Sequence, residues 1–167
     1  MRLPDHRPGP SHTMYEIADS LKEFIESPVA AVLGTASAAG RPHVTYCWGP
    51  AVGDDRRSVA FHVNETVATE ALADIVETGR IALTVADPIT YRSVQLKGRC
   101  LGTGPASGED EAFVQRHFES FLSITAVIGD PPAAIRNLKR SEPLRRFVFE
   151  VEAAFDQTPG PDAGRPL

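Results

Sequence analysis

The chain has 167 residues and 42% hydrophobic content, which suits one domain with a single core. Its 22 acidic and 17 basic residues give a net charge of −5, so we expect no broad basic face for nucleic acid or for an anionic membrane. The expected partner is instead a small molecule or another protein.

The N-terminal half is expected to hold one helix and three strands. Apolar residues at helical intervals predict a helix over 14–26, in which Thr13 and Glu16 have capping-box spacing, and the Ser27-Pro28 pair ends it. Two strands are expected over 29–35 and 43–48, and alternating apolar residues predict a third strand over 58–63.

The rest of the chain is expected to alternate between helices and strands. Thr66 is expected to cap a short helix with an apolar stripe at Ala68, Leu72, Ile75 and Val76, and Gly79 to end it in the left-handed conformation. Strands are expected over 80–86, over 91–102, where Ser93, Gln95 and Lys97 share a polar face, and over 145–155. Helices are expected over 109–127 and from Pro131 or Pro132.

These elements predict a mainly β fold with flanking helices. Six strands in hairpin order, with no β-α-β alternation, favour an antiparallel barrel with helices outside. We expect a flexible segment over 1–12, a barrel domain over 13–156 and a tail over 157–167 whose apolar content is too low for it to fold alone.

The stretch LGTASAAGRPHVTYCWG, residues 33–49, raises the question of a phosphate-binding loop. A P-loop needs four residues between its glycines and then a Lys with a hydroxyl residue, whereas five residues separate Gly34 from Gly40 and Arg41-Pro42 follows. A dinucleotide-binding loop would open a helix, but strand residues follow Gly40. The stretch therefore predicts a hairpin turn.

Side chains for covalent or metal chemistry are few. His43 and Cys47 would lie ~13 Å apart on one strand, too far to share an ion, so we expect no metal site. No nucleophile motif occurs, and Cys47 and Cys100 are expected to be buried, inert thiols in a chain that forms no disulfide framework. The absence of an apolar stretch long enough for a bilayer, and of a signal peptide, favours a reducing cytoplasm.

Two segments, FHVNETVAT and TYRSVQLKGR, carry the polar residues of most interest. The third strand, the short helix and the long fifth strand are expected to converge there. His62, Asn64, Thr66 and Thr69, with the unpaired amides of the helix start, would form an anion site, to which Arg92 and Ser93 would add donors. The alternative is that Asn64 and Thr66 only cap a helix and that Arg92 lies in solvent.

The order of these segments, from VLGTASAAGRPHVTYCWG through VAFHVNETVATEALADIVETGRIALTVADP to TYRSVQLKGRC, resembles the pyridoxamine 5'-phosphate oxidase-like superfamily of FMN-binding split barrels. The resemblance covers about Ile25 to Thr103. It implies a six-stranded antiparallel split β-barrel, a homodimer, and a flavin in a groove between the two subunits.

The resemblance also assigns expected cofactor contacts. The strand that supplies flavin contacts in the superfamily maps onto His62, Val63 and Asn64, and the RQV-like element of the fifth strand maps onto Arg92-Ser93-Val94. The helix start that carries a basic phosphate motif in the superfamily reads TVATEA here, so Thr66 and Thr69 would replace it. FMN is therefore expected to be held weakly.

The resemblance implies a flavin-dependent oxidoreductase of unknown substrate, and related barrels make a deazaflavin cofactor a further option. No residue can be named as an acid or a base. The other class left open is a non-enzymatic dimer that binds flavin, deazaflavin or haem, where His62 or His117 would be the axial haem ligand.

Overall fold

The computed structural model describes residues 15–139 and 143–167. Within them the chain forms six strands, four α-helices and one 3-10 turn. In chain order the elements are α1 (Asp19–Glu26), β1 (Ala30–Ala36), β2 (Pro42–Val52), β3 (Ser58–Asn64), η1 (Glu65–Val67), α2 (Thr69–Thr78), β4 (Arg80–Ala86), β5 (Ser93–Pro105), α3 (Gly108–Val127), α4 (Pro132–Leu138) and β6 (Leu144–Asp156).

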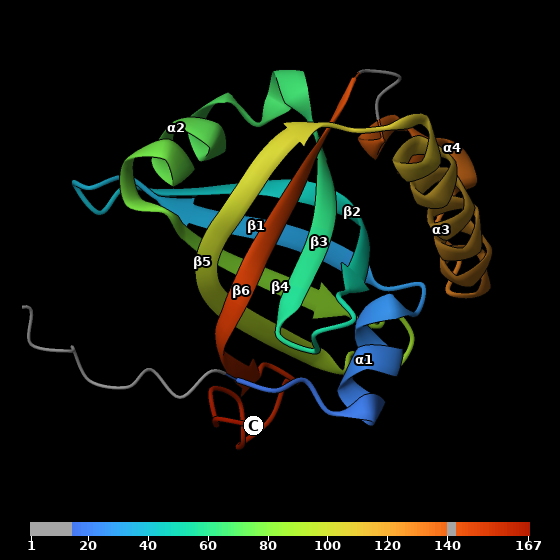
Figure 1. Cartoon of the computed structure of the whole chain (residues 1–167). Coiled ribbons are helices and arrows are strands. Elements are labelled where there is room, and N and C mark those ends of the chain that lie inside the picture. Colours follow the sequence, from blue (N-terminus) through green and yellow to red (C-terminus); the bar gives the residue numbers. More distant parts are fainter. Residues whose placement is uncertain (1–14, 140–142) are drawn as a thin grey trace, which may run out of the picture.

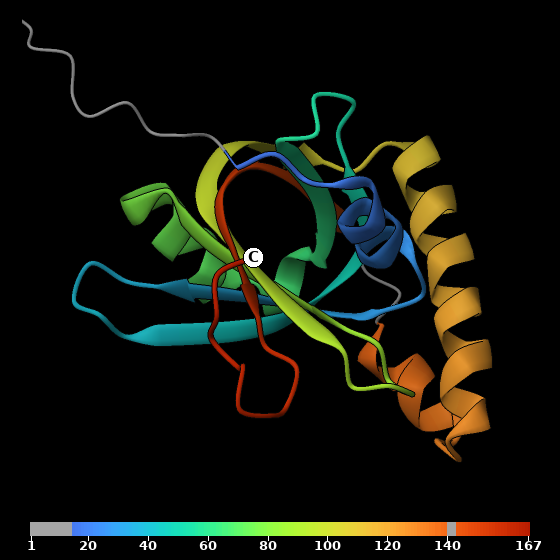
Figure 2. The same cartoon turned by 90° about the horizontal axis from the view of Figure 1, so that it is seen from below.

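The six strands close into one barrel in the order β1-β2-β3-β6-β5-β4, and every neighbouring pair is antiparallel. Figure 1 shows β6 crossing the barrel between β3 and β5, and Figure 2 looks into the barrel from below. The predicted six-stranded antiparallel split barrel is thus confirmed. In this barrel the inward faces of the strands form the core, so a ligand can bind only on their outward faces.

The barrel interior is filled by the alternating apolar residues that the sequence placed on one face of each strand. Phe61 and Phe147 stack at 5.4 Å between ring centroids, and Leu83 and Leu96 are fully buried. On β5 the predicted split of faces is also confirmed, because Val94 and Leu96 point inward while the alternate residues point outward.

The outer face of β2, β1, β4 and β5 carries two cross-strand rows of side chains. Register pairs Val44 with Gly34, Gly34 with Ala82 and Ala82 with Lys97, so these four lie in one row. The neighbouring row consists of Tyr46, Val32, Thr84 and Gln95. Val44 and Tyr46 are exposed to 72% and 48%. The β2 side of this face therefore exposes two large apolar side chains to water, whereas the β5 side carries Gln95 and Lys97.

Two element boundaries differ from the sequence expectation. Helix α1 begins at Asp19 rather than residue 14, because Ile17 is extended, donates its amide to the Arg56 carbonyl at 2.8 Å and buries its side chain. Thr13 and residue 14 lie outside the described residues. Strand β2 continues to Val52 rather than ending at residue 48. A bulge between Trp48 and Ala51 contains the pair Gly49-Pro50, which would interrupt the hydrogen bonds of a regular strand.

The short helix also starts later than expected. The chain first makes the η1 turn, so Ala68 rather than Thr66 precedes the first turn of α2. Of the expected stripe, Ala68 and Ile75 are buried but Val76 is 85% exposed. Gly79 ends the helix at φ 65°, as predicted.

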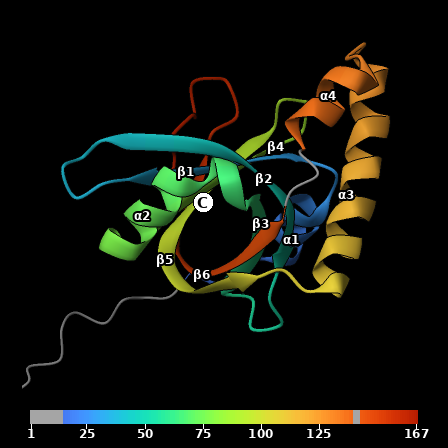
Figure 3. The same ribbon diagram turned by 90° about the horizontal axis from the view of Figure 1, so that it is seen from above.

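Helices α3 and α4 pack along one side of the barrel and do not cover its end, as Figure 3 shows from above. A second apolar cluster joins them to the sheet through Trp48, Val114, Phe118, Leu122 and Leu144. Trp48 meets Phe118 edge to face, with centroids 5.3 Å apart. Across the described residues, no helix has the length and apolar content that a membrane span requires.

The C-terminal tail returns onto the end of the barrel. Amides of Gly164 and Leu167 donate to the carbonyls of Asp156 and Ala154 at 2.6 and 3.0 Å. The Ser93 amide donates to the Thr158 hydroxyl at 3.1 Å. Main-chain bonds to β5 and β6, rather than apolar burial, hold this segment.

Candidate functional site

A cavity of about 460 Å³ opens on the outer face of β1 and β2, beside η1 and the end of α4. We call it the Asn64 cavity; it is lined by Val32, Val44, Thr45, Tyr46, Asn64, Val67, Asn137 and Leu138. Its described lining residues include no Lys, Arg or His. The cavity therefore offers apolar walls, one aromatic ring and two amides, but no cation.

Asn64 is fixed in place at the end of β3. Its side chain is buried, and its Oδ1 accepts a hydrogen bond from Trp48 Nε1 at 3.1 Å. Trp48 in turn stacks on Tyr46, with centroids 6.3 Å apart. These contacts orient the amide and the aromatic wall of the cavity together, before any ligand enters.

A second cavity of about 420 Å³ lies on the same outer face and shares Val44 with the first. We call it the Lys97 cavity; it is lined by Gly34, Thr35, Ala36, Pro42, His43, Val44, Arg80, Ile81, Ala82, Gln95, Lys97 and Gly98. The small Gly34 and Ala82 lie at the centre of their cross-strand row, which leaves the space open. The cations here are Lys97, whose Nζ lies 4.9 Å from the Phe155 ring centroid, and Arg80, which pairs with Glu152 at 2.6 Å.

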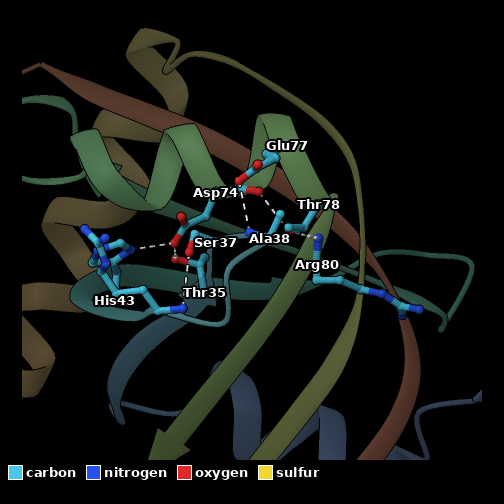
Figure 4. A network of polar contacts seen from close by, with 9 residues as sticks. Thr35, Ser37, Ala38, His43, Asp74, Glu77, Thr78 and Arg80 are labelled. Carbon is cyan, nitrogen blue, oxygen red and sulfur yellow. Dashed lines mark hydrogen bonds and ion pairs between the residues drawn. The ribbon is translucent and has the colours of Figure 1, made fainter.

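A buried polar network supports the β1–β2 hairpin beside the Lys97 cavity. Figure 4 shows Thr35 and His43 both directed toward Asp74 of α2. The Thr35 hydroxyl donates to Asp74 Oδ2 at 2.7 Å, and His43 Nδ1 lies 2.7 Å from the same oxygen. The bond from His43 is the main cause that lowers the pKa of Asp74, with help from Thr35 and against the effect of burial. The carboxylate is therefore ionised and fastens α2 to the hairpin.

The structure gathers part of the sequence-predicted site at the end of β3. Asn64 lines the Asn64 cavity, Thr66 lies in η1 beside the lining residue Val67, and Thr69 begins α2 with its hydroxyl donating to the Thr66 carbonyl at 3.4 Å. Val63 is fully buried in the barrel core. The expected cluster therefore reaches the cavity mainly through Asn64.

His62 lies on the same outer face of β3 as Asn64, but it does not line the Asn64 cavity and instead contacts α3. Its ring is 2% exposed; Nδ1 lies 3.4 Å from the Trp48 carbonyl oxygen, and Nε2 lies 3.3 Å from Asp110 Oδ1 without hydrogen-bond geometry. Burial lowers the pKa of His62, although Asp110 opposes that effect. The ring serves the packing of α3 against the barrel.

Arg92 and Ser93 do not lie beside Asn64 within one chain. Ser93 begins β5, which pairs with the end of β6, whereas Asn64 pairs with Leu144 at its start. The 13 residues of β6 separate the two places by about 40 Å along the strand. The Arg92 guanidinium instead lies 4.2 Å from the Phe24 ring centroid. The expected convergence fails because the end of β3 and the start of β5 pair with opposite ends of β6.

Of the remaining candidate groups, Cys47 is buried as expected, whereas Cys100 is only partly buried because it lies in the second half of β5, where most residues are exposed. The ring of His117 has its Nε2 3.0 Å from the Ser27 carbonyl oxygen, so neither candidate haem ligand presents an unengaged Nε2 to a large cavity. Burial raises the pKa of the Cys47 and Cys100 thiols, with a smaller opposing effect of Gly102 on Cys100. Among the described residues, no three His, Cys, Asp or Glu side chains are grouped as a metal ion would require.

The fold defines a split-barrel protein, and comparison with known families agrees. A family model described as "Pyridoxamine 5'-phosphate oxidase" matches residues 17–157. The chain therefore belongs to this family, as the sequence resemblance indicated. A search of curated proteins found no match.

Solved structures share the fold at low sequence identity. HupZ of Group A Streptococcus is 17% identical with a TM-score of 0.54, and the match covers 89% of this chain and 99% of that one. An F420 reductase is 16% identical with a TM-score of 0.54, covering 83% and 98%. A putative pyridoxamine 5'-phosphate oxidase from Lactobacillus delbrueckii is 13% identical with a TM-score of 0.53, covering 84% and 93%. These likenesses concern the fold alone.

Proposed function

We propose that this protein is a flavin-binding oxidoreductase that holds the tricyclic flavin ring in the Asn64 cavity. The observation that carries the proposal is the composition of that cavity: about 460 Å³ enclosed by Val32, Val44 and Val67, with Tyr46 as an aromatic wall. Planar heteroaromatic ligands prefer such apolar, aromatic walls with few polar groups. Asn64 and Asn137 supply the amides that can bind the polar edge of the ring.

The residues present fit the flavin ring better than its phosphate. A phosphate is normally held by Arg or Lys or by several main-chain amides at a helix start, and no cation lines the Asn64 cavity among the described residues. The Lys97 cavity, which shares Val44 with the Asn64 cavity, is lined by Arg80 and Lys97. We therefore expect FMN to bind through its ring, with a dissociation constant in the micromolar range or weaker.

The bound flavin supplies hydride or electron transfer, and the chain supplies position. Tyr46 and the valines exclude water from the ring, while the bond from Trp48 keeps the Asn64 amide in one orientation. A deazaflavin has the same tricyclic shape, so it would occupy the same cavity.

A homodimer is part of the proposal. The side chains of Val44 and Tyr46 are 72% and 48% exposed on the outer sheet face, and both line the Asn64 cavity. A second copy packed on this face would cover these side chains and enclose the ligand. Light scattering should give twice the chain mass at micromolar concentration; a monomer would remove the two-subunit groove from the proposal.

A cavity-filling pair of variants tests the proposed function. Val32→Phe places a larger side chain within the Asn64 cavity, whereas Val76→Phe makes the same change at an 85% exposed position on α2. In fluorescence titrations with riboflavin, Val32→Phe should weaken binding by about tenfold or more and Val76→Phe by less than about twofold. Equal riboflavin affinity in both variants would place the flavin elsewhere.

Turnover separates an oxidoreductase from a protein that only binds flavin. Under anaerobic conditions, a reduced nicotinamide should bleach the absorbance of bound flavin faster with the wild-type protein than with Val32→Phe. Equal rates would favour the non-enzymatic binding protein.

A further inference from the structure

A third, much smaller cavity of about 30 Å³ lies between the β1–β2 outer face and α3. It is lined by Val29, Ala30, Ala31, Tyr46, Trp48, His117, Phe121 and Leu138. Tyr46 and Leu138 line the Asn64 cavity as well, so these two side chains form the boundary between the two spaces. The volume holds one water or one functional group of a larger ligand.

His117 lines this small cavity together with Tyr46 and Trp48, and it contributes the imidazole ring. The tautomer of that ring is fixed. The Ser27 carbonyl oxygen, 3.0 Å from Nε2, can only accept a hydrogen bond, so Nε2 carries the proton. Burial lowers the pKa of His117 and outweighs the opposing effect of that bond, so the ring is neutral near pH 7. Nδ1 therefore carries a lone pair.

That lone pair has no partner in the described part of the chain. Nδ1 is buried, and none of residues 15–139 or 143–167 makes a hydrogen bond to it. A buried acceptor without a donor is unfavourable, and protein interiors rarely keep one. Because the ring is already fixed by Ser27, the missing donor has to come from outside the described residues.

We propose that His117 Nδ1 accepts a hydrogen bond from an N–H or O–H group of the ligand in the Asn64 cavity, which reaches it between Tyr46 and Leu138. The inference rests on the proposed function for the identity of that ligand. An oxidised flavin ring carries a single ring N–H, at N3 on its pyrimidine edge. His117 then selects for flavins that keep this donor and orients the ring with its pyrimidine edge toward α3.

A methylated flavin separates this role from simple packing. Riboflavin and 3-methylriboflavin differ only at N3, and they are titrated into the wild type, His117→Gln and Arg116→Gln. The glutamine amide can still donate to Ser27 but offers no acceptor at the position of Nδ1. Arg116→Gln introduces the same residue at an exposed neighbouring position on α3.

The wild type and Arg116→Gln should bind riboflavin about tenfold or more tightly than 3-methylriboflavin, and His117→Gln should bind the two within about threefold. The same ratio in wild type and His117→Gln would overturn the inference, because the methyl group would then act only by its size. If the wild type binds neither flavin, the proposed function falls and this inference with it; the two failures are therefore distinguishable.

A measurement on the wild type alone guards against a variant that does not fold. The ¹⁵N resonance of His117 Nδ1 should move toward its hydrogen-bonded value when riboflavin is added, and should not move with 3-methylriboflavin. An Nδ1 resonance that ignores riboflavin at saturation would overturn the inference, since a water would then satisfy the lone pair.

Discussion

The two large cavities share Val44 and one sheet face, yet they differ in chemistry. The Asn64 cavity is closed by η1 and α4 and is lined by aliphatic groups, Tyr46 and two amides. The Lys97 cavity lies over Gly34 and Ala82 and is edged by Lys97 and Arg80. The first suits a neutral planar ring; the second has the charge that an anion needs.

Under the proposed function, this difference would let the barrel hold the flavin ring without a phosphate site. Because strand residues alternate between the two faces of the sheet, strand register places Val32, Val44 and Tyr46 on the same outer face. These apolar walls of the Asn64 cavity therefore follow from the fold itself. A phosphate site depends on single residues at the helix start, where TVATEA carries no base. The following predictions test whether the two cavities act separately.

The largest expected effect concerns the network behind the Lys97 cavity. Asp74→Ala should lower the free energy of unfolding by about 2–4 kcal/mol, because Thr35 and His43 lose a charged acceptor. Riboflavin affinity should change by less than about twofold, since Asp74 does not line the Asn64 cavity. Chemical denaturation measures the first quantity and fluorescence titration the second.

Glu77→Ala is the control for this variant. Glu77 lies on the same helix but is exposed, and in the described part of the chain it accepts the Ala38 amide at 3.0 Å. Its loss should cost less than about 1 kcal/mol. An equal loss of unfolding free energy in the two variants would mean that Asp74 does not stabilise the contact between α2 and the hairpin.

The next largest effect concerns the aromatic wall of the Asn64 cavity. Tyr46→Ala should weaken riboflavin binding by about tenfold to thirtyfold, because a stacked aromatic contact and its buried area are lost. Tyr91→Ala removes another exposed tyrosine that lines neither cavity and should leave the affinity within about twofold. A comparable loss in both variants would contradict the ring site.

The sequence predicted the strands well because their residues alternate in the chain itself. Ile17 and the Gly-Pro pair misled the prediction of α1 and β2, because a tertiary amide bond to Arg56 and a bulge decide those boundaries. Asn64 was singled out from its place after the predicted third strand, and it lines the Asn64 cavity. Asp74 was missed, although a carboxylate between the buried Ala71 and Ile75 was a visible sign of a buried network.

Other parts of the site had no local sequence pattern. His117 and Ser27 are 90 residues apart, and only the tertiary packing of α3 beside the end of α1 brings them together. The walls of the Asn64 cavity come from β1, β2, β3, η1 and α4. Arg92 and Asn64 were grouped by order along the chain, but strand register places them at opposite ends of β6.

The buried histidines give a pH dependence. The pKa values of His62 and His117 are lowered in the folded chain, chiefly by burial, so below about pH 6.5 the unfolded chain binds protons that the folded chain does not. Stability should therefore fall as the pH drops from 7 toward 5, by at most about 1.4 kcal/mol per pH unit for each histidine.

His117→Gln removes one of these two contributions, so its stability should vary less with pH than that of Arg116→Gln. Denaturation curves at several pH values between 5 and 7.5 measure both slopes. Identical slopes would show that His117 takes up its proton equally in the folded and unfolded chains.

A small effect is expected from Arg92, which lies outside both cavities. Arg92→Ala should lower the free energy of unfolding by about 0.5–1 kcal/mol, because the cation–π contact with Phe24 is lost. FMN and riboflavin affinities should stay within about twofold of the wild type. A tenfold loss for FMN alone would indicate that Arg92 of a second copy reaches the phosphate.

The most direct test of the central claim compares FMN with riboflavin on the cofactor-free protein. If the flavin is held by its ring in the Asn64 cavity, the two dissociation constants should lie in the micromolar range or weaker and within about tenfold of each other, a gap below ~1.4 kcal/mol. Nanomolar FMN with far weaker riboflavin would contradict the account. It would mean that Arg80 or Lys97 binds the phosphate, and that the two cavities act as one site.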